Sequence, residues 1–177
     1  CNEQGILLID EAYDCWWQGK NPYDFGRFFE KPATHPDAEP GQTWGEFTIK
    51  NLVDEAKNDP CVMLWSLGNE IQQILTEKCP DVAAQLKTWV NEVDSSRGVT
   101  IGDSYIQVEY PFNENHEATD ELMDAVGFNY GNFSNYDKAH QDHPDWFIYG
   151  SENASAISSR GYYYHPENDW HTGKHPE

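Results

Sequence analysis

Two glutamates close two short hydrophobic segments: Glu70 ends residues 62–70, and Glu152 ends residues 147–152. Both segments are rich in residues that favour β-structure, so each predicts a buried strand with a carboxylate at its exit. Burying an ionised carboxylate costs free energy, and such groups cluster at functional sites. Two carboxyl groups about 5 Å apart can cleave a glycosidic bond as an acid and nucleophile pair. We predict this role for both residues; for Glu70 the alternative is a loop acid that caps the following helix.

Further polar side chains end the neighbouring predicted strands. Asn69 precedes Glu70, and Asn129 and Tyr130 close the segment 124–130. A phenol at this place can donate a hydrogen bond to a nucleophilic carboxylate and hold it in one rotamer. A tyrosine at the edge of the core is the alternative for Tyr130. The other strand ends carry Asp10, Glu11, Asp103 and Ser151.

Residues 13–45 form a predicted long loop that contains four prolines, and long loops in compact domains are commonly functional or mobile. Trp16 and the tryptophan after it could stack on a sugar face; the alternative is that they pin the loop to the core. Asp10, Glu11 and Asp14 could bind a cation, although acids that follow a strand serve more often as acceptors for loops or substrate. We place Asp14 and Trp16 among the substrate-binding candidates.

The sequence predicts no metal site and no cofactor. His140 and His143 have a spacing found in metal sites, but they lie in a predicted loop with only two aspartates nearby, so no metal is assigned to them. None of the four cysteines forms a C-x-x-C pair, which argues against zinc and thioredoxin-like chemistry and favours a reducing compartment such as the cytoplasm. Neither a G-x-S-x-G segment nor a glycine-rich phosphate loop follows a strand.

Predicted strands alternate with predicted helices along the chain. Strands are expected at residues 5–11, 62–67, 99–103, 124–130 and 146–151, and helices at 44–57, 81–93, 115–123 and 136–140. The continuous apolar run at 5–11 is expected to be a strand covered on both faces. Thr43 and Asp81 are expected to cap the first two helices. This alternation predicts a parallel sheet with right-handed crossovers. Polar residues at the carboxyl ends of several strands are typical of a (β/α) barrel.

The chain of 177 residues suits one domain and is strongly acidic, with 31 Asp and Glu against 11 Lys and Arg and a formal net charge of −20. Nucleic acids and anionic membrane surfaces are bound by basic patches, so neither is an expected partner. No apolar stretch approaches the ~20 residues that a membrane helix needs. A neutral, hydroxyl-rich ligand is compatible with this composition, although most of the acids are expected only to keep the surface soluble.

Four segments together resemble the barrel domain of glycoside hydrolase family 2, the family of β-galactosidases, β-glucuronidases and β-mannosidases. Their sequences are GILLIDEA at 5–12, WSLGNE at 65–70, GFNY at 127–130 and YGSE at 149–152. The resemblance runs from Cys1 to about Tyr164. The loop at 14–24 and the stretch at 154–162 look most like the bacterial β-galactosidase type.

The resemblance implies that Glu70 is the acid/base and Glu152 the nucleophile of a retaining β-glycosidase, and that its substrate is a β-linked glycoside or oligosaccharide. It also implies that Asn69 contacts the substrate 2-hydroxyl and that Tyr130 supports the nucleophile, and Asn129 joins the substrate-binding candidates. A β-galactosidase is the first expectation; a β-glucuronidase or β-mannosidase is the alternative. A cellulase-like enzyme is a further alternative, although those enzymes usually place proline where Ile71 follows the Asn-Glu pair.

In this family the acid ends the fourth barrel strand and the nucleophile ends the seventh, so the five predicted strands would be strands three to seven. We therefore expect an α/β fold of the partial TIM-barrel type, in a single catalytic-domain fragment over residues 1–177 that is truncated at both ends. Its expected partners are the missing strands and β-sandwich domains of a parent chain. The alternative to an enzyme is an inert fragment. Magnesium-binding members use a glutamate and a histidine where residues 14–17 stand here, so no metal is implied.

Overall fold

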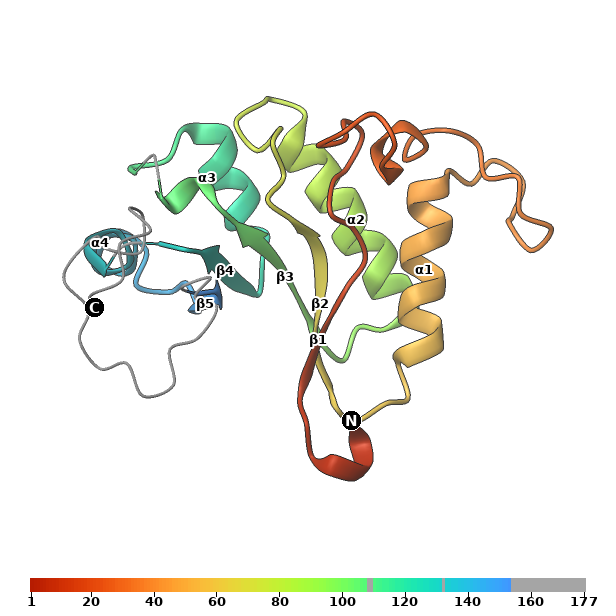
Figure 1. The fold of residues 1–177 in the computed structure, drawn as a ribbon, viewed down its shortest axis with the longest axis horizontal. Helices are drawn as coiled ribbons and strands as arrows, with labels where there is room; N and C mark the ends of the chain where they lie inside the picture. The colour runs from red at the N-terminus through yellow and green to blue at the C-terminus, as the bar shows by residue number, and fades with distance from the viewer. Residues whose placement is uncertain (108–109, 132, 154–177) are drawn as a thin grey trace, which may run out of the picture.

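The computed structural model describes residues 1–107, 110–131 and 133–153, which form an α/β fold with one parallel sheet curled into half a barrel (Figure 1). The sheet has the strand order β1-β2-β3-β4-β5, with β1 Leu8–Glu11, β2 Val62–Asn69, β3 Gly98–Asp103, β4 Ala125–Asn129 and β5 Ile148–Glu152. The helices are α1 Trp44–Ala56, α2 Cys79–Val93, α3 Glu114–Asp120 and α4 Phe133–Asp142. Short 3-10 turns cover η1 Asn2–Gln4, η2 Phe25–Arg27 and η3 Tyr105–Gln107. The prediction of a partial barrel with five parallel strands is confirmed.

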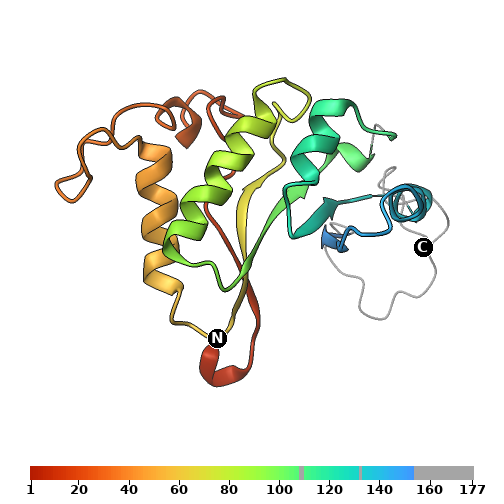
Figure 2. The same cartoon turned by 180° about the vertical axis from the view of Figure 1, so that it is seen from behind.

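The core lies between the sheet and the helices α1, α2 and α3, which pack in a row along it (Figure 2). Side chains alternate between the two faces of a strand, and the helix-facing positions of the central strands are large and apolar. They are Trp65, Leu67, Val99, Ile101, Val126 and Phe128, all nearly or fully buried. The opposite, inner face carries small or polar residues, among them Ser66, Thr100, Gly102 and Gly127. This leaves the inner face of the half-barrel free for polar chemistry.

Local signals set the start of two helices. Thr43 has extended backbone, and its hydroxyl accepts a hydrogen bond from the Glu46 N–H at 3.2 Å, so it caps α1 as predicted. The prediction that Asp81 caps α2 is wrong, because the helix begins at Cys79 after Lys78, which makes no side-chain cap. Pro80 fits the first turn of a helix, where a missing N–H costs nothing, and Asp81 lies within that turn.

The two outer strands are less buried than the sequence predicts. Residues 5–11 were expected to be covered on both faces, but Leu7 is 63% exposed and β1 itself alternates between half-buried and exposed residues. Likewise Phe147, before β5, is 68% exposed. Both predictions of full burial are wrong because β1 and β5 each pair with a single neighbouring strand among the described residues.

Among the described residues no helix combines the length and the apolar character that a bilayer crossing requires. The stretch 154–162, which contributed to the family resemblance, lies outside the described residues.

Candidate active site

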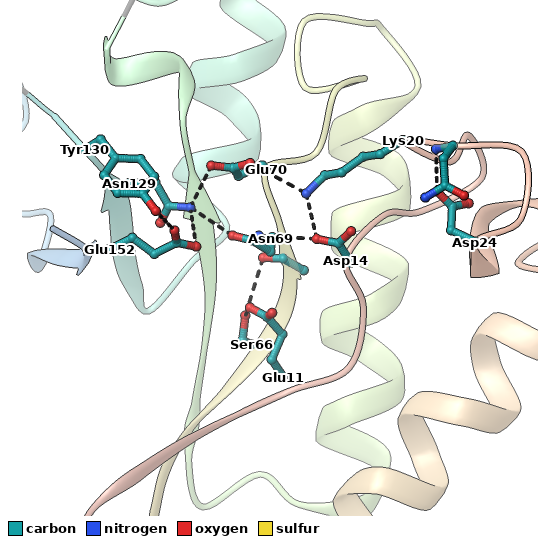
Figure 3. A network of polar contacts seen from close by, with 12 residues as sticks. Glu11, Asp14, Lys20, Asp24, Ser66, Asn69, Glu70, Asn129, Tyr130 and Glu152 are labelled. Carbon is teal, nitrogen blue, oxygen red and sulfur yellow. Dashed lines mark hydrogen bonds and ion pairs between the residues drawn. The ribbon is translucent and has the colours of Figure 1, made fainter. Parts of the chain in front are cut away.

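The strand ends bring the predicted site residues together. Asn69 is the last residue of β2 and Glu70 follows it, Asn129 ends β4 and Tyr130 follows it, and Glu152 ends β5. Because all five strands are parallel, their carboxyl ends lie at one edge of the sheet (Figure 3). Residues more than 80 positions apart in the chain therefore meet in one polar network.

Asn129 stands at the centre of this network and is fully buried. Its Nδ2 atom lies 3.2 Å from Glu70 Oε1 and 2.9 Å from Glu152 Oε1, and it also donates to Asn69 Oδ1 at 2.9 Å (Figure 3). The Ser151 hydroxyl donates to Asn129 Oδ1 at 2.6 Å, which fixes which end of the amide faces the carboxylates. One nitrogen within reach of both carboxylates limits the separation of these two oxygens to about 6 Å.

Gly102 of β3 makes the central contact possible. A Cβ atom on this glycine would lie 2.9 Å from Asn69 Oδ1 and 3.3 Å from Asn129 Oδ1. Both distances are tighter than ordinary van der Waals contact, so a side chain here would push the two amides apart. At Gly102, β3 therefore presents only its backbone, and the side chains of Asn69 and Asn129 can meet across it.

The Tyr130 hydroxyl donates a hydrogen bond to Glu152 Oε2, so both oxygens of this carboxylate are held, one by the phenol and one by the amide of Asn129. A carboxylate that accepts two hydrogen bonds from separate elements is confined to one rotamer. The predicted contact between Tyr130 and Glu152 is present in the structure.

The backbone turns sharply at the two residues that follow β2 and β4. Glu70 has φ 48° and Tyr130 has φ 56°, the only non-glycine residues with positive φ in the described part of the chain. The Glu70 N–H donates to Gly102 O at 2.6 Å and the Tyr130 N–H to Glu152 O at 2.8 Å. Left-handed backbone is disfavoured for residues with a Cβ atom and clusters at functional sites.

Lys20, which was given no role in the sequence analysis, lies beside the acid pair. Its Nζ atom lies 2.7 Å from Asp14 Oδ1 and 3.7 Å from Glu70 Oε2, and Asn69 Nδ2 donates to Asp14 Oδ1 at 3.3 Å. Asp14 thereby joins the network from the first loop, as a partner of Asn69 and Lys20 (Figure 3). The sequence offered one signal for this ion pair: a lysine stands six residues after Asp14 in a chain with a net charge of −20.

Trp16 does not reach this network. Its side chain is fully buried, and its indole N–H donates to Leu67 O at 2.8 Å. The placement of Trp16 among the substrate-binding residues is therefore wrong in this structure, because the ring packs in the core and is not accessible to a ligand. The alternative, that this residue pins the first loop to the core, is what the structure has.

The floor of the inner face holds a second pair of polar contacts. Ser66 donates to Glu11 Oε2 at 2.8 Å, and the hydroxyls of Thr100 and Tyr149 lie 3.0 Å apart. Desolvation raises the pKa of the Glu11 carboxyl, and the negative charges of Asp14 and Glu152 raise it further, against the hydrogen bond from Ser66.

Asp10 faces the other side of the sheet, where it borders a hollow beside α1 with Phe47 and Asn51. The structure therefore does not bring Asp10, Glu11 and Asp14 together as a cation site; Glu11 and Asp14 act as hydrogen-bond acceptors. His140 and His143 do not pair either, since His143 lies with Glu117 and Glu121.

A hollow of about 400 Å³ opens beside Glu70. It is lined by Lys20, Gln72, Ser104, Tyr105 and Gln107 in addition to the glutamate. These side chains place hydrogen-bond donors and acceptors beside Glu70.

Parallel strands alternating with helices, with a polar network at their carboxyl ends, define a domain of the (β/α) barrel class. The family model described as "Glycosyl hydrolases family 2, TIM barrel domain" matches residues 1–167. The chain therefore belongs to glycosyl hydrolase family 2, through its TIM-barrel domain.

Individual relatives agree with this assignment. The chain is 24% identical over 197 residues to the β-galactosidase BoGH2A of Bacteroides ovatus, across 94% of this chain and 21% of that protein. A crystal structure of a family 2 member from Bacteroides cellulosilyticus is similar with a TM-score of 0.69 and 30% identity, over 84% of this chain and 17% of that one. A β-glycosidase from Bacteroides vulgatus shares the fold, with a TM-score of 0.59 and 23% identity over 82% of this chain and 15% of that one. The chain spans about a fifth of the length of the curated β-galactosidase.

Proposed function

We propose that the protein is a retaining β-glycosidase in which Glu152 is the nucleophile and Glu70 is the acid/base. The observation that carries the proposal is the amide of Asn129, which lies within 3.2 Å of both carboxylates. Retaining enzymes place their two carboxyl groups ~5–5.5 Å apart, whereas inverting enzymes leave ~6.5–9.5 Å for a water molecule. The limit of about 6 Å set by Asn129 favours the retaining arrangement.

The two carboxylates have different contacts, and these support a different role for each of them. Glu152, held on both oxygens by Tyr130 and Asn129, attacks the anomeric carbon and forms a glycosyl ester. Glu70, which borders the hollow, protonates the departing glycosidic oxygen. In the second step Glu70 removes a proton from water, and the resulting nucleophile releases the sugar from Glu152. Glu70 therefore begins and ends the cycle protonated, and the enzyme gains or loses no net proton.

The proposed substrate is a β-galactoside. The support is the name of the Bacteroides ovatus relative, which is a β-galactosidase. The side chains with hydrogen-bonding groups that line the hollow beside Glu70 suit a hydroxylated leaving group such as a second sugar. A panel of aryl β-glycosides, assayed with the full-length protein, tests this choice: the β-galactoside should be hydrolysed with the highest kcat/KM, and preference for a β-glucuronide or β-mannoside would replace the sugar while keeping the reaction.

The reaction itself is tested by chemical rescue. Glu152→Gly should abolish turnover of an aryl β-glycoside in the full-length protein, and azide or formate should restore it, because a small anion fills the space of the carboxylate. Glu11→Gln is the matched control: it removes another acid of the inner face, so turnover should persist and azide should change nothing. Undiminished activity in Glu152→Gly would overturn the assignment.

A further inference from the structure

Three ionisable side chains meet on the helix-facing side of the sheet, away from the proposed glycosidase site. Asp103 is the last residue of β3, and His116 and Asp120 lie one turn apart on α3. All three are buried, at 1%, 0% and 0% exposure. One ligand atom from each lies within 4.8 Å of the others. We call these residues the β3–α3 cluster.

The cluster leaves polar atoms without hydrogen bonds. Asp120 Oδ1 and the Nδ1 atom of His116 are buried and have no hydrogen-bond partner among the described residues, and Asp120 Oδ2 has only the ion pair with His116 Nε2 at 3.4 Å. Asp103 differs, because its Oδ1 atom accepts the Tyr105 N–H at 2.9 Å. Buried carboxylate oxygens are very rarely left in this state, since an unsatisfied charged group is costly in a low dielectric. The buried carboxylate of Asp120 can therefore accept a further partner that carries positive charge.

The charges of the cluster do not balance. Two aspartates face one imidazole, so even a protonated His116 leaves a net negative charge in the core. A cation bound between the three side chains would offset this charge.

We propose that the β3–α3 cluster binds a zinc ion through Asp103, His116 and Asp120. His116 Nε2 lies 3.2 Å from Asp103 Oδ2 and 3.4 Å from Asp120 Oδ2. Tetrahedral zinc with bonds of about 2.0–2.1 Å separates neighbouring ligands by about 3.3 Å. Magnesium and calcium prefer all-oxygen sites, so the imidazole favours zinc over either. Three protein ligands and one water complete the coordination.

The position of this site gives it a structural role. The bond from zinc would join the end of β3 to α3 across the core, and no atom of the metal site belongs to the carboxylate network around Asn129. Ser104 and Tyr105, which follow Asp103 directly, line the hollow beside Glu70. Zinc would thereby hold the wall of that hollow in place. The inference does not depend on the proposed glycosidase activity.

The test measures metal binding by the full-length protein. After treatment with EDTA and dialysis against micromolar zinc, we expect one zinc per chain by atomic emission. Asp120→Asn and His116→Gln should each weaken zinc binding more than tenfold. His143→Gln is the matched control, because His143 lies with Glu117 and Glu121 in a more exposed cluster, and its loss should leave the stoichiometry at one.

A second measurement on the unmodified protein guards against variants that fail to fold. Cobalt in place of zinc should give the intense visible absorption of a tetrahedral ion, and zinc should raise the midpoint of thermal unfolding. A folded protein that retains no zinc, and whose midpoint responds to neither zinc nor EDTA, would overturn the proposal; the cluster would then be an ion cluster with a protonated imidazole. Equal zinc binding by Asp120→Asn would overturn it too.

Discussion

At the scale of single residues, the amide of Asn129 links the two halves of the proposed mechanism. It donates toward Glu152 on one side and toward Glu70 on the other, while Ser151 fixes its orientation. Two hydrogens are shared among three acceptors, so a change in either carboxylate is felt by the other through this group. Preorganised donors of this kind stabilise charge without reorganising during the reaction.

Removing the Asn129 amide should therefore damage catalysis more than stability. We expect Asn129→Ala to lower kcat/KM by roughly 100-fold, the magnitude found when one preorganised donor is removed from an active site. Steady-state kinetics on an aryl β-glycoside measure the effect, with circular dichroism as the check on folding. A loss below threefold in a folded variant would mean that the contacts to both carboxylates are incidental.

At the scale of the elements, β3 contributes to the site because Gly102 has no side chain. We expect Gly102→Ala to lower kcat/KM by about tenfold while the variant stays folded, because a methyl group at 2.9 Å from Asn69 Oδ1 displaces a flexible amide rather than backbone. Gly127→Ala offers a contrast, since its Cβ would meet the Ile101 carbonyl at 2.6 Å and should cost stability as well. Kinetics and thermal unfolding of both variants separate the two effects; equal loss of stability would contradict the argument.

The end of α2 is held by a second set of charges. Asp94 accepts hydrogen bonds from Trp65 Nε1 at 3.0 Å, Arg97 Nη1 at 2.7 Å and the Ser96 N–H at 2.8 Å. Burial alone would raise the pKa of Asp94, but the hydrogen bonds from Ser96, Arg97 and Trp65 lower it well below its usual range. A depressed pKa in the folded state contributes stability at neutral pH that is lost as the pH falls below the ordinary aspartate pKa of about 4.

Asp94→Asn should accordingly lower the free energy of unfolding by about 3 kcal/mol at pH 7, because it leaves a largely buried Arg97 without its anion. The difference from the unmodified protein should shrink between pH 5 and pH 3, as Asp94 becomes protonated on unfolding. Urea unfolding at several pH values measures both. Asp54→Asn, which breaks an exposed pair with Lys57, is the control and should change stability by less than ~0.5 kcal/mol.

The strands and helices were largely predictable from sequence because their signals are local. The predictions that failed concern contacts between residues far apart in the chain. Periodicity and strand-end polar residues located all five strands, and Thr43 marked the start of α1, because these signals are local. For Trp16 the sequence left two alternatives open, and the choice between them depends on the Leu67 carbonyl 51 positions away. The β3–α3 cluster was missed for the same reason: Asp103 lies on a different element from His116, and no short spacing announces the three residues.

At the scale of the whole molecule, the half-barrel leaves apolar side chains exposed near both ends of its sheet. Ile9 and Met63, on β1 and β2, are 38% and 45% exposed, and Phe147 before β5 is 68% exposed. Exposed apolar side chains, and strand edges that stay unpaired among the described residues, promote association with other chains. A closed barrel would cover both edges and complete the wall around the site.

We therefore expect the 177-residue chain, expressed alone, to be poorly soluble or inactive unless a partner supplies further strands. Size-exclusion chromatography and an aryl β-galactoside assay measure the two properties, with the full-length protein as the reference. A monomeric sample of the chain that hydrolyses the substrate at an ordinary enzyme rate would contradict this expectation.

The left-handed backbone at Glu70 and Tyr130 has an evolutionary consequence. Each position imposes a conformation that glycine or asparagine adopts more readily, at a cost of order 1 kcal/mol for other residues. A lineage released from selection for catalysis would gain stability by drifting to glycine at either place. Under the proposed function, an acid and a phenol stand at these two positions because the reaction needs their side chains, despite the conformational cost.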